Sequence, residues 1–286
     1  MPSSAPLPGR RQRRFALFAQ LVAVVLAVGA VVTVIAEGPG GHPAADRLAA
    51  DEIASLPPLV AAPLPPSVSP SPSEAVPVPS SPPPVLRAPG AVPSAGTGGF
   101  GYDDRSGPVL GRAGELRRYR VAVESGSNED AAEFALAVQA ALAGPGSWVD
   151  SGRLRLQQVP GDAPRDFTVY LATARTAGRM CADGGVDIRV GGRPYTSCRA
   201  PGQVIINLDR WRLSVPHFVS AGVPLSVYRT YVVNHEVGHQ LGHRHERCPG
   251  AGRPAPVMMQ QTLFLNGCRV NQWPYLDGRR YAGPAL

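Results

Sequence analysis

The sequence contains no lysine, so arginine supplies all 28 of its basic side chains, and its formal net charge is +7. In the part that we predict to fold, these arginines are scattered, and no aromatic stacking motif accompanies them. Nucleic-acid-binding proteins instead gather their basic residues into a patch or along one helix. We therefore expect no nucleic-acid partner and only a weak attraction to an anionic wall or membrane surface.

Cysteine is also scarce, with four residues and no C-x-x-C pair. Of the three possible connectivities, pairing Cys181 with Cys198 and Cys248 with Cys268 closes the shortest loops. A bridge over a loop of this size stabilises a fold by roughly 3 kcal/mol. The second bridge would enclose residues 256–258. The alternative is four free thiols in a cytosolic protein, and the next segment argues against it.

One stretch, residues 15–36, carries no charge and consists mostly of Val, Ala and Leu. At about 1.5 Å per residue it is roughly 33 Å long, enough to cross a hydrocarbon core of about 30 Å. The arginines of residues 1–14 should stay in the cytoplasm. We therefore predict a cytoplasmic tail at 1–14, a transmembrane anchor at 15–36 and an extracytoplasmic location for the rest. The alternative is a cleaved signal ending near Ala36, which would make the protein secreted.

Residues 37–98 lack hydrophobic periodicity and are rich in Pro, Ala, Ser and Val, with 14 prolines between Pro57 and Pro93. Such a composition cannot bury enough apolar surface to form a core. We predict a disordered, polyproline-biased linker that reaches at most roughly 190 Å, at about 3.1 Å per residue. The folded, extracytoplasmic domain is then expected over residues 99–286.

Strand and helix patterns fill this last part of the chain. A helix is predicted to start at a cap on Ser127 or Asn128 and to end at Gly144, with Phe134, Val138 and Leu142 on its buried face. A second helix is predicted over residues 225–241. Five strands are predicted by alternating or continuous apolar residues, over 118–124, 153–159, 166–172, 186–190 and 203–208.

The second helix carries the pattern H-E-x-x-H-x-x-G-x-x-H. The four-residue step from His235 to His239 places both imidazoles on one helix face. Gly242 tolerates the positive φ that a sharp helix end requires, so that His245 can turn back toward the same point. Three protein ligands and an open position are typical of a catalytic Zn²⁺ site. Glu236 lies beside the ligand face, which suits a base better than a ligand.

This extended pattern resembles the metzincin branch of zinc metallopeptidases. The chain also resembles an actinobacterial family of membrane-anchored, metzincin-like domains, in which Cys-Pro-Gly and Pro-Val-Met segments follow the motif, as they do here at 248–250 and 256–258. The resemblance implies an α+β, zincin-like domain with a mixed five-stranded sheet and a small C-terminal subdomain. It also implies that Met258, in preference to Met259, forms the methionine turn beneath the metal. The alternative is a methionine that only fills the core.

The function that this resemblance implies is that of a membrane-anchored zinc peptidase. Glu236 would assist the attack of zinc-activated water on a peptide bond of a protein, a peptide or the peptide stem of a cell-wall polymer. In that family an edge strand above the cleft pairs with the substrate, and residues 203–208 are the candidate here. Two alternatives stay open. One is an idle zinc module that binds wall polymer or a protein partner, and the other is a zinc that only holds the C-terminal subdomain in place.

Overall fold

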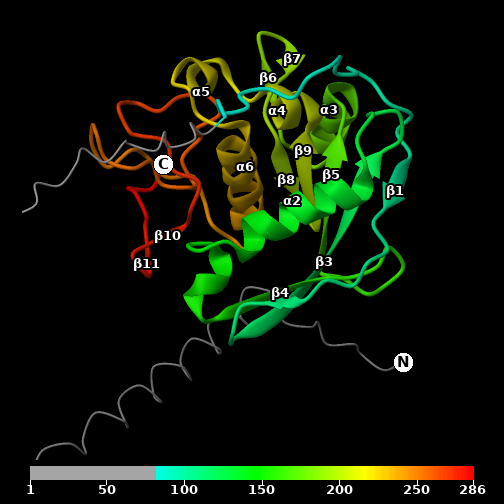
Figure 1. Ribbon diagram of the computed structural model, residues 1–286, viewed down its shortest axis with the longest axis horizontal. Helices are drawn as coiled ribbons and strands as arrows, with labels where there is room; N and C mark the ends of the chain where they lie inside the picture. The colour runs from blue at the N-terminus through cyan, green and yellow to red at the C-terminus, as the bar shows by residue number, and fades with distance from the viewer. Residues whose placement is uncertain (1–81) are drawn as a thin grey trace, which may run out of the picture. The chain divides into compact units, whose positions relative to one another are not determined.

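A mixed sheet of seven strands organises the part of the chain that the computed structural model describes, residues 82–286 (Figure 1). Its strands are β1 (Phe100–Tyr102), β2 (Val109–Leu110), β3 (Glu115–Glu124), β4 (Leu154–Gln158), β5 (Phe167–Ala172), β8 (Cys198–Ala200) and β9 (Gln203–Asn207). Strands β4, β3, β5 and β9 lie side by side in parallel. Antiparallel strands complete the sheet, with β2 beside β4, β8 beside β9 and β1 beside β3. The predicted α+β class with a mixed sheet is confirmed.

Helices cover both faces of this sheet (Figure 1). They are α2 (Ala131–Ala143), α3 (Ala174–Asp183), α4 (Leu208–Leu213), α5 (Pro216–Ser220), α6 (Leu225–Gln240) and the short 3-10 helix η1 (Trp148–Ser151). Two hairpins lie outside the sheet, β6 (Arg189–Val190) with β7 (Arg193–Pro194), and β10 (Tyr275–Leu276) with β11 (Arg279–Arg280). Residues 246–286 contain little other regular structure.

Alternation along the central strands assigns the helices to their faces. Val169 and Leu171 of β5 and Ile206 of β9 point into a large core that they share with α2 and α6. Ala172 of β5 and Ile205 of β9 point the other way, into a smaller core with α3. Because successive side chains of a strand point to opposite faces, the same strands supply both cores. Helix α6, which carries the histidine motif, packs against β9 and the edge strand β8.

Helix α2 confirms the predicted pattern of one buried face. Phe134, Val138 and Leu142 are all buried. The cap is neither of the residues that the sequence suggested, because the side chain of Asp130 accepts the hydrogen bond from the Glu133 amide, at 2.9 Å. The helix is still capped by a short side chain that accepts a hydrogen bond, but this residue lies two to three positions after the predicted ones.

Three features of the sheet and one helix differ from the prediction. The sheet has seven strands in place of five, since the short strands β1, β2 and β8 show too little alternation to be recognised. Residues 186–190 contribute only to the β6–β7 hairpin, outside the sheet. Residues 203–208 form β9, which lies between β5 and β8, so the edge strand is β8. Helix α3 was not predicted, because its buried face consists of small residues, among them Ala177 and Cys181.

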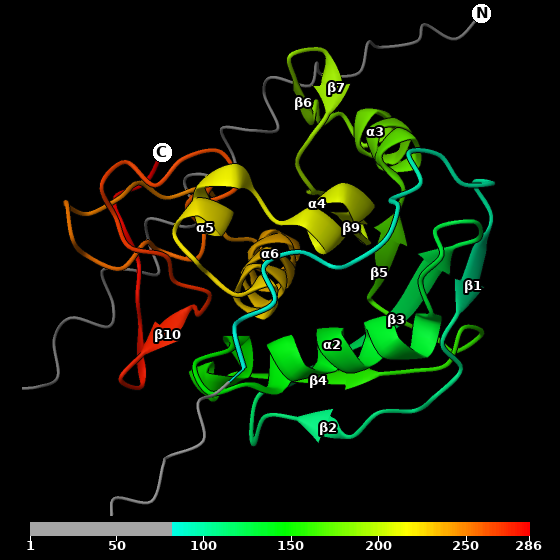
Figure 2. The same cartoon turned by 45° about the horizontal axis from the view of Figure 1, so that its top comes forward.

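The folded domain also begins earlier than predicted. Residues 82–99, which we call the strap, run over the surface past α6, α4 and α3 before entering β1 (Figure 2). The Val85 carbonyl accepts a hydrogen bond from the first residue of α6, at 2.8 Å, and the Ser94 carbonyl accepts one from α3, at 3.1 Å. A proline-rich chain makes no hydrogen bonds with itself, so its carbonyls are free for the domain. Composition alone therefore placed residues 82–98, nearly the whole strap, in the linker.

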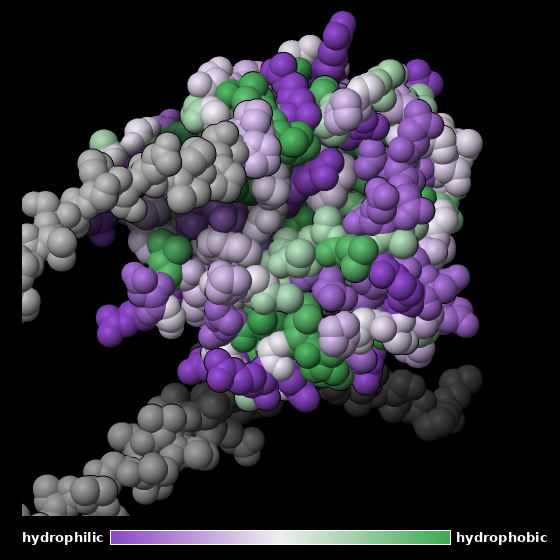
Figure 3. All heavy atoms as spheres, viewed as in Figure 1, coloured by the Kyte–Doolittle hydropathy of each residue, from purple (hydrophilic) through white to green (hydrophobic). Residues whose placement is uncertain are grey.

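The predicted tail at 1–14, the anchor at 15–36 and most of the linker lie outside the described residues. Within residues 82–286, no helix combines the length and apolar character that crossing a membrane requires. The face shown in Figure 3 is covered largely by hydrophilic residues, and the hydrophobic ones on it form small separate groups.

Candidate metal centre

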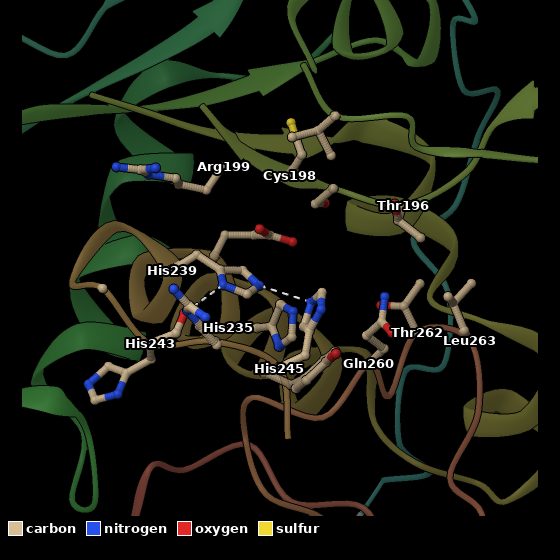
Figure 4. A pocket seen from close by; sticks show the side chains of 16 residues that line it. Thr196, Cys198, Arg199, His235, His239, His243, His245, Gln260, Thr262 and Leu263 are labelled. Atoms are coloured by element: carbon tan, nitrogen blue, oxygen red, sulfur yellow. Dashed lines mark hydrogen bonds between the residues drawn. The ribbon is translucent and has the colours of Figure 1, made fainter. Parts of the chain in front are cut away.

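The three predicted ligands converge in one place. Ligand atoms of His235, His239 and His245 all lie within 4.8 Å of one another. The Nε2 atoms of His239 and His245 are 3.0 Å apart, a distance that suits either a hydrogen bond or two ligands of one ion. Figure 4 shows the three rings facing one another on the floor of the cleft. The structure therefore brings together residues that are up to ten positions apart in the sequence.

Helix α6 and its abrupt end create this convergence. His235 and His239 are one turn apart near the end of the helix, which ends at Gln240. Gly242 follows with φ of 95°, the left-handed conformation predicted for this position. The chain then reverses, and His245 meets the two helical rings. A residue with a side chain would be strained at Gly242.

Hydrogen bonds hold two of the rings in the orientation that a ligand requires. Nδ1 of His235 lies 2.8 Å from the Val257 carbonyl, and Nδ1 of His239 lies 2.8 Å from the His243 carbonyl. A carbonyl only accepts, so each Nδ1 carries the proton and each Nε2 presents its lone pair to the cluster. Such backbone contacts fix the tautomer of metal-binding histidines.

Burial keeps the three imidazoles uncharged at neutral pH. It lowers the pKa of His235 well below 6.5, and repulsion from His239 adds to the effect. Burial with the same repulsion lowers the pKa of His245 to about 4. The pKa of His239 is also lowered, first by burial and further by the charge of Arg199. Neutral imidazole is the form that binds a metal ion.

Glu236 is buried beside the cluster, with 5% of its surface exposed. Its carboxylate makes no hydrogen bond or ion pair with any residue in the described part of the chain. Burial alone raises the pKa of Glu236 to about 8. Burial without a charged partner favours the uncharged, protonated form of this carboxyl.

Met258, the residue predicted to form the methionine turn, packs against the helix that carries the motif. Its side chain is fully buried, and its sulfur lies so close to Gly238 of α6 that a Cβ on this glycine would collide with it. The Val257 carbonyl that orients His235 belongs to the same segment. Met259 points instead into a separate small core near Cys268. Of the two methionines, Met258 is the one whose side chain packs against Gly238 of α6.

Three residues that sequence analysis did not single out hold this segment and the helix together. The hydroxyl of Tyr231 donates to the Met259 carbonyl at 3.0 Å, and that of Tyr228 lies 3.0 Å from the Thr262 hydroxyl. Gly238 leaves room for Met258. The sequence spacing could have identified the two tyrosines, because Tyr228 and Tyr231 precede His235 by seven and four residues and so share its helix face.

His243 has no place in the motif, yet it supports the site. Its carbonyl orients His239, as described above, and its ring stacks on Trp148 with centroids 4.3 Å apart. Trp148 in turn donates its Nε1 hydrogen to the Asn234 carbonyl at 2.8 Å. The chain beyond Gly242 is therefore anchored to η1, and this contact limits where His245 can lie.

Both disulfides have the connectivity that closes the shortest loops, Cys181 to Cys198 and Cys248 to Cys268. The first joins α3 to the edge strand β8. The second encloses the segment that contains Met258. No free cysteine is present in the described part of the chain.

A cleft of about 410 Å³ opens above the three histidines. Residues 196–199, from the edge strand β8 and the turn before it, form its upper rim, and Gln260, Thr262 and Leu263 form part of its lower rim (Figure 4). The edge strand above the cleft is thus β8, and the earlier candidate, residues 203–208, is one strand further in. A molecule entering the cleft would meet both the free edge of the sheet and Glu236.

The residues of this site fit a metal ion. Three uncharged imidazoles converge, two of them are locked with Nε2 free, and the cleft leaves room for a further ligand. Imidazole nitrogens suit zinc, copper, nickel and iron. The structure therefore shows a cluster that could hold a metal ion, and it leaves the identity of that ion open.

Comparisons with known proteins give one match. A search of curated proteins and a search of solved structures both find nothing that matches. A scan against protein-family models matches residues 86–276, which include part of the strap, the whole sheet and the metal centre. The match covers more than half of the chain, and the chain therefore belongs to the family described as "Protein of unknown function (DUF3152)".

Proposed function

We propose that the chain is a zinc-dependent peptidase of metzincin type, anchored to the membrane and acting outside the cytoplasm. The observation that carries this proposal is Glu236, a buried carboxylate without a partner in the described residues, beside three converging imidazoles under an open cleft. A carboxylate that lies in a cleft and has a strongly raised pKa is a candidate for a catalytic group. A metal kept only for structure has no need of this side chain.

The free ring nitrogens of His235, His239 and His245 would hold the zinc ion. When bound, zinc supplies a Lewis acid that polarises an amide carbonyl and makes water more acidic. The three imidazoles are uncharged at neutral pH, so no proton has to leave before they bind the ion.

Glu236 is the residue that moves the proton. Its carboxylate takes a proton from water as the water oxygen attacks the amide carbon. It then delivers this proton to the amide nitrogen, so that the carbon–nitrogen bond breaks and a free amine leaves. Burial raises the pKa of Glu236 to about 8, which makes its carboxylate a stronger base in the first step and its carboxyl an acid suited to neutral pH in the second.

The remaining residues hold these groups in place. Met258 would serve as the methionine turn, since it supports α6 beneath the ligands and its neighbour Val257 orients His235. The disulfides favour an oxidising compartment, which agrees with export by residues 15–36. Together with the histidine motif, this arrangement supports the metzincin resemblance.

The full chain and its Glu236→Gln variant test the proposal. Bound zinc is quantified in both, and both are incubated with a mixed peptide library whose products are identified by mass spectrometry. We expect one zinc ion per chain in each protein and cleavage only by the wild type, with at least about a thousandfold loss in the variant. His239→Ala should lose the zinc itself.

A second outcome would favour another function. If both proteins hold zinc and neither cleaves any peptide, the peptidase proposal fails. The domain would then be a zinc-containing module that binds wall polymer or a protein partner through the same cleft. If Glu236→Gln loses its zinc, Glu236 acts in metal binding and the assigned role is wrong.

A further inference from the structure

Among the charged side chains that line the cleft, positive charges outnumber negative ones. Besides the histidines, these side chains are Arg199, Arg244 and Glu236. Glu236 is buried and engaged in the proposed chemistry, which leaves two permanent positive charges facing the substrate. Arginine stays protonated at every physiological pH. A ligand in this cleft therefore meets a positive field.

Arg199 is the more buried of the two arginines, and its guanidinium is anchored by a hydrogen bond. It lies on the edge strand β8 and is half-buried, whereas Arg244 is exposed. Its Nε hydrogen is donated to Gln240 Oε1 at 3.0 Å, so the guanidinium is held between β8 and the last residue of α6. Within residues 82–286 its two Nη groups have no hydrogen-bond partner, and Arg199 makes no ion pair.

Arg199 also occupies one end of the cleft only. In Figure 4 it lies on the same side as His243, while Thr196, Thr262 and Leu263 line the opposite side. The two ends of the cleft therefore differ in chemistry, since Arg199 lies at one end and Thr196, Thr262 and Leu263 lie at the other. A substrate that crosses the histidine cluster would place residues from the two sides of its scissile bond at these two ends.

We propose that Arg199 is a specificity-determining residue that binds a carboxylate of the substrate on one side of the scissile amide. A guanidinium that is already anchored through Nε presents its two Nη groups as a planar fork, which matches the two oxygens of a carboxylate. The substrate class is therefore acidic peptides. This inference rests on the proposed peptidase function and extends it.

The groove next to the cleft also has more positive than negative side chains. Val186 lines both the cleft and a neighbouring groove of about 960 Å³. The groove is lined by four arginines and two aspartates, namely Arg175, Arg179, Arg189, Arg193, Asp187 and Asp209. One aspartate is already paired, since Asp187 lies 2.9 Å from Arg189. An acidic peptide that leaves the cleft over Val186 would remain in a favourable field.

A purely structural role for Arg199 is the competing explanation, because its bond to Gln240 joins β8 to α6. The two roles differ in what a charge reversal does. If Arg199 only joins two elements, glutamine and glutamate in its place should lower cleavage of all peptides alike. If it reads a carboxylate, the choice among peptides should change.

Peptide pools test this on the full chain loaded with zinc. The pools share randomised flanking positions and amidated C-termini and differ only in a central Glu, Gln or Lys. We expect the wild type to cleave the Glu pool about tenfold faster than the Gln pool, with Glu always on the same side of the cleaved bond. Arg199→Gln should bring this ratio close to one, and Arg199→Glu should favour the Lys pool. A Gln pool with a free C-terminus shows whether a terminal carboxylate is accepted as well.

Arg112→Gln is the matched control. Arg112 is exposed and lies next to β2, at the opposite edge of the sheet from β8, so its loss removes the same charge far from the cleft. It should leave the ratio at its wild-type value. A wild type that cleaves the Glu and Gln pools equally would overturn the carboxylate proposal while the peptidase function stands.

If no pool is cleaved, a binding measurement distinguishes carboxylate recognition by Arg199 from the peptidase function. The zinc-loaded Glu236→Gln chain is titrated with fluorescent Glu and Gln pools, with and without Arg199→Gln. Tighter binding of the Glu pool that disappears with Arg199→Gln would support carboxylate recognition in a protein that is not a peptidase. Equal binding of both pools would overturn the role of Arg199.

Discussion

Residues 100–240 and residues 246–286 meet at the metal centre but are stabilised in different ways. The first region has a seven-stranded sheet between helices and contains most of the large buried core. The second has one hairpin, of two strands with two residues each, and two isolated bridges. Its own core consists of Ala255, Met259 and Cys268. The C-terminal region therefore depends on polar contacts and a covalent bond where the first depends on packing.

Buried amides supply many of these polar contacts. The side chain of Gln261 donates to the Pro256 and Asn271 carbonyls, and that of Asn271 donates to the Ala255 and Trp273 carbonyls. Such bonds satisfy backbone groups that a sheet or helix would otherwise satisfy. A chain without regular structure can thus hold Val257 and Met258 against α6. The comparison teaches that the first region provides two ligands, His235 and His239, and that the second region orients one of them, His235, through the Val257 carbonyl.

The largest loss of stability should come from removing the disulfide of the C-terminal region, Cys248–Cys268. In Cys248→Ser/Cys268→Ser we expect the free energy of unfolding to fall by about 3 kcal/mol and zinc affinity to fall with it. The reason is that Val257, which orients His235, lies inside the opened loop. Urea unfolding of the full chain in detergent and competition with a chelator measure the two quantities.

The other bridge is the control, since it closes a loop of similar size, with a sequence separation of 17 against 20. Cys181→Ser/Cys198→Ser should lose a similar amount of unfolding free energy but retain more of its zinc affinity, because pairing with β9 still holds β8. Equal losses of zinc affinity in the two variants would show that the C-terminal region is not the weaker support.

An intermediate loss of stability is expected from a substitution at Gly238, where α6 of the first region contacts Met258 of the second. Gly238→Ala places a methyl group on the sulfur of Met258 and about 2.7 Å from the ring of Trp148. Such overpacking should lower the free energy of unfolding by roughly 2 kcal/mol, although alanine is otherwise the better helix former. Gly101→Ala is the control, because no atom lies within 4 Å of the added methyl group. Stabilisation by Gly238→Ala would mean that Met258 moves aside at no cost.

The smallest loss of stability is expected from replacing Glu124, whose hydrogen bonds make a contribution to stability that depends on pH. Burial alone would raise the pKa of Glu124, but hydrogen bonds from Thr176, Thr173 and Gly98 lower it below its ordinary value of 4.5. The stability that ionised Glu124 contributes is therefore present above about pH 4.5 and is lost as the pH falls through the lower, folded-state pKa. Glu124→Gln should cost roughly 1.5 kcal/mol at pH 7, and the difference from wild type should shrink at pH 3.

Urea titrations of both proteins at the two pH values check this. Glu124 joins the strap to β5 and α3, since Gly98 belongs to the strap and Thr173 to the start of α3. A difference that does not change with pH would show that packing, and not the charge, accounts for the contribution of Glu124.

Much of the site could be predicted because its information is local. The spacing of His235, His239 and Gly242 defines a helix face and its end within a few residues, and the structure places all three as expected. Helix α2 was predictable for the same reason, since its buried face repeats every four residues. The short strands, the small-residue helix α3 and the strap were not, because their partners are distant in the sequence.

By itself, then, the sequence determined the α+β class, the histidine motif with its helix and the disulfide pairing that closes the shortest loops. Only the tertiary structure decided that β8 is the edge strand, that Val257 and His243 orient the ligands, and that Arg199 stands over the cleft beside Gln240. The physical reason is the range of the interactions. Periodicity and turn chemistry act over a few residues, whereas strand order, buried hydrogen bonds and the position of a charge depend on which distant segments pack together.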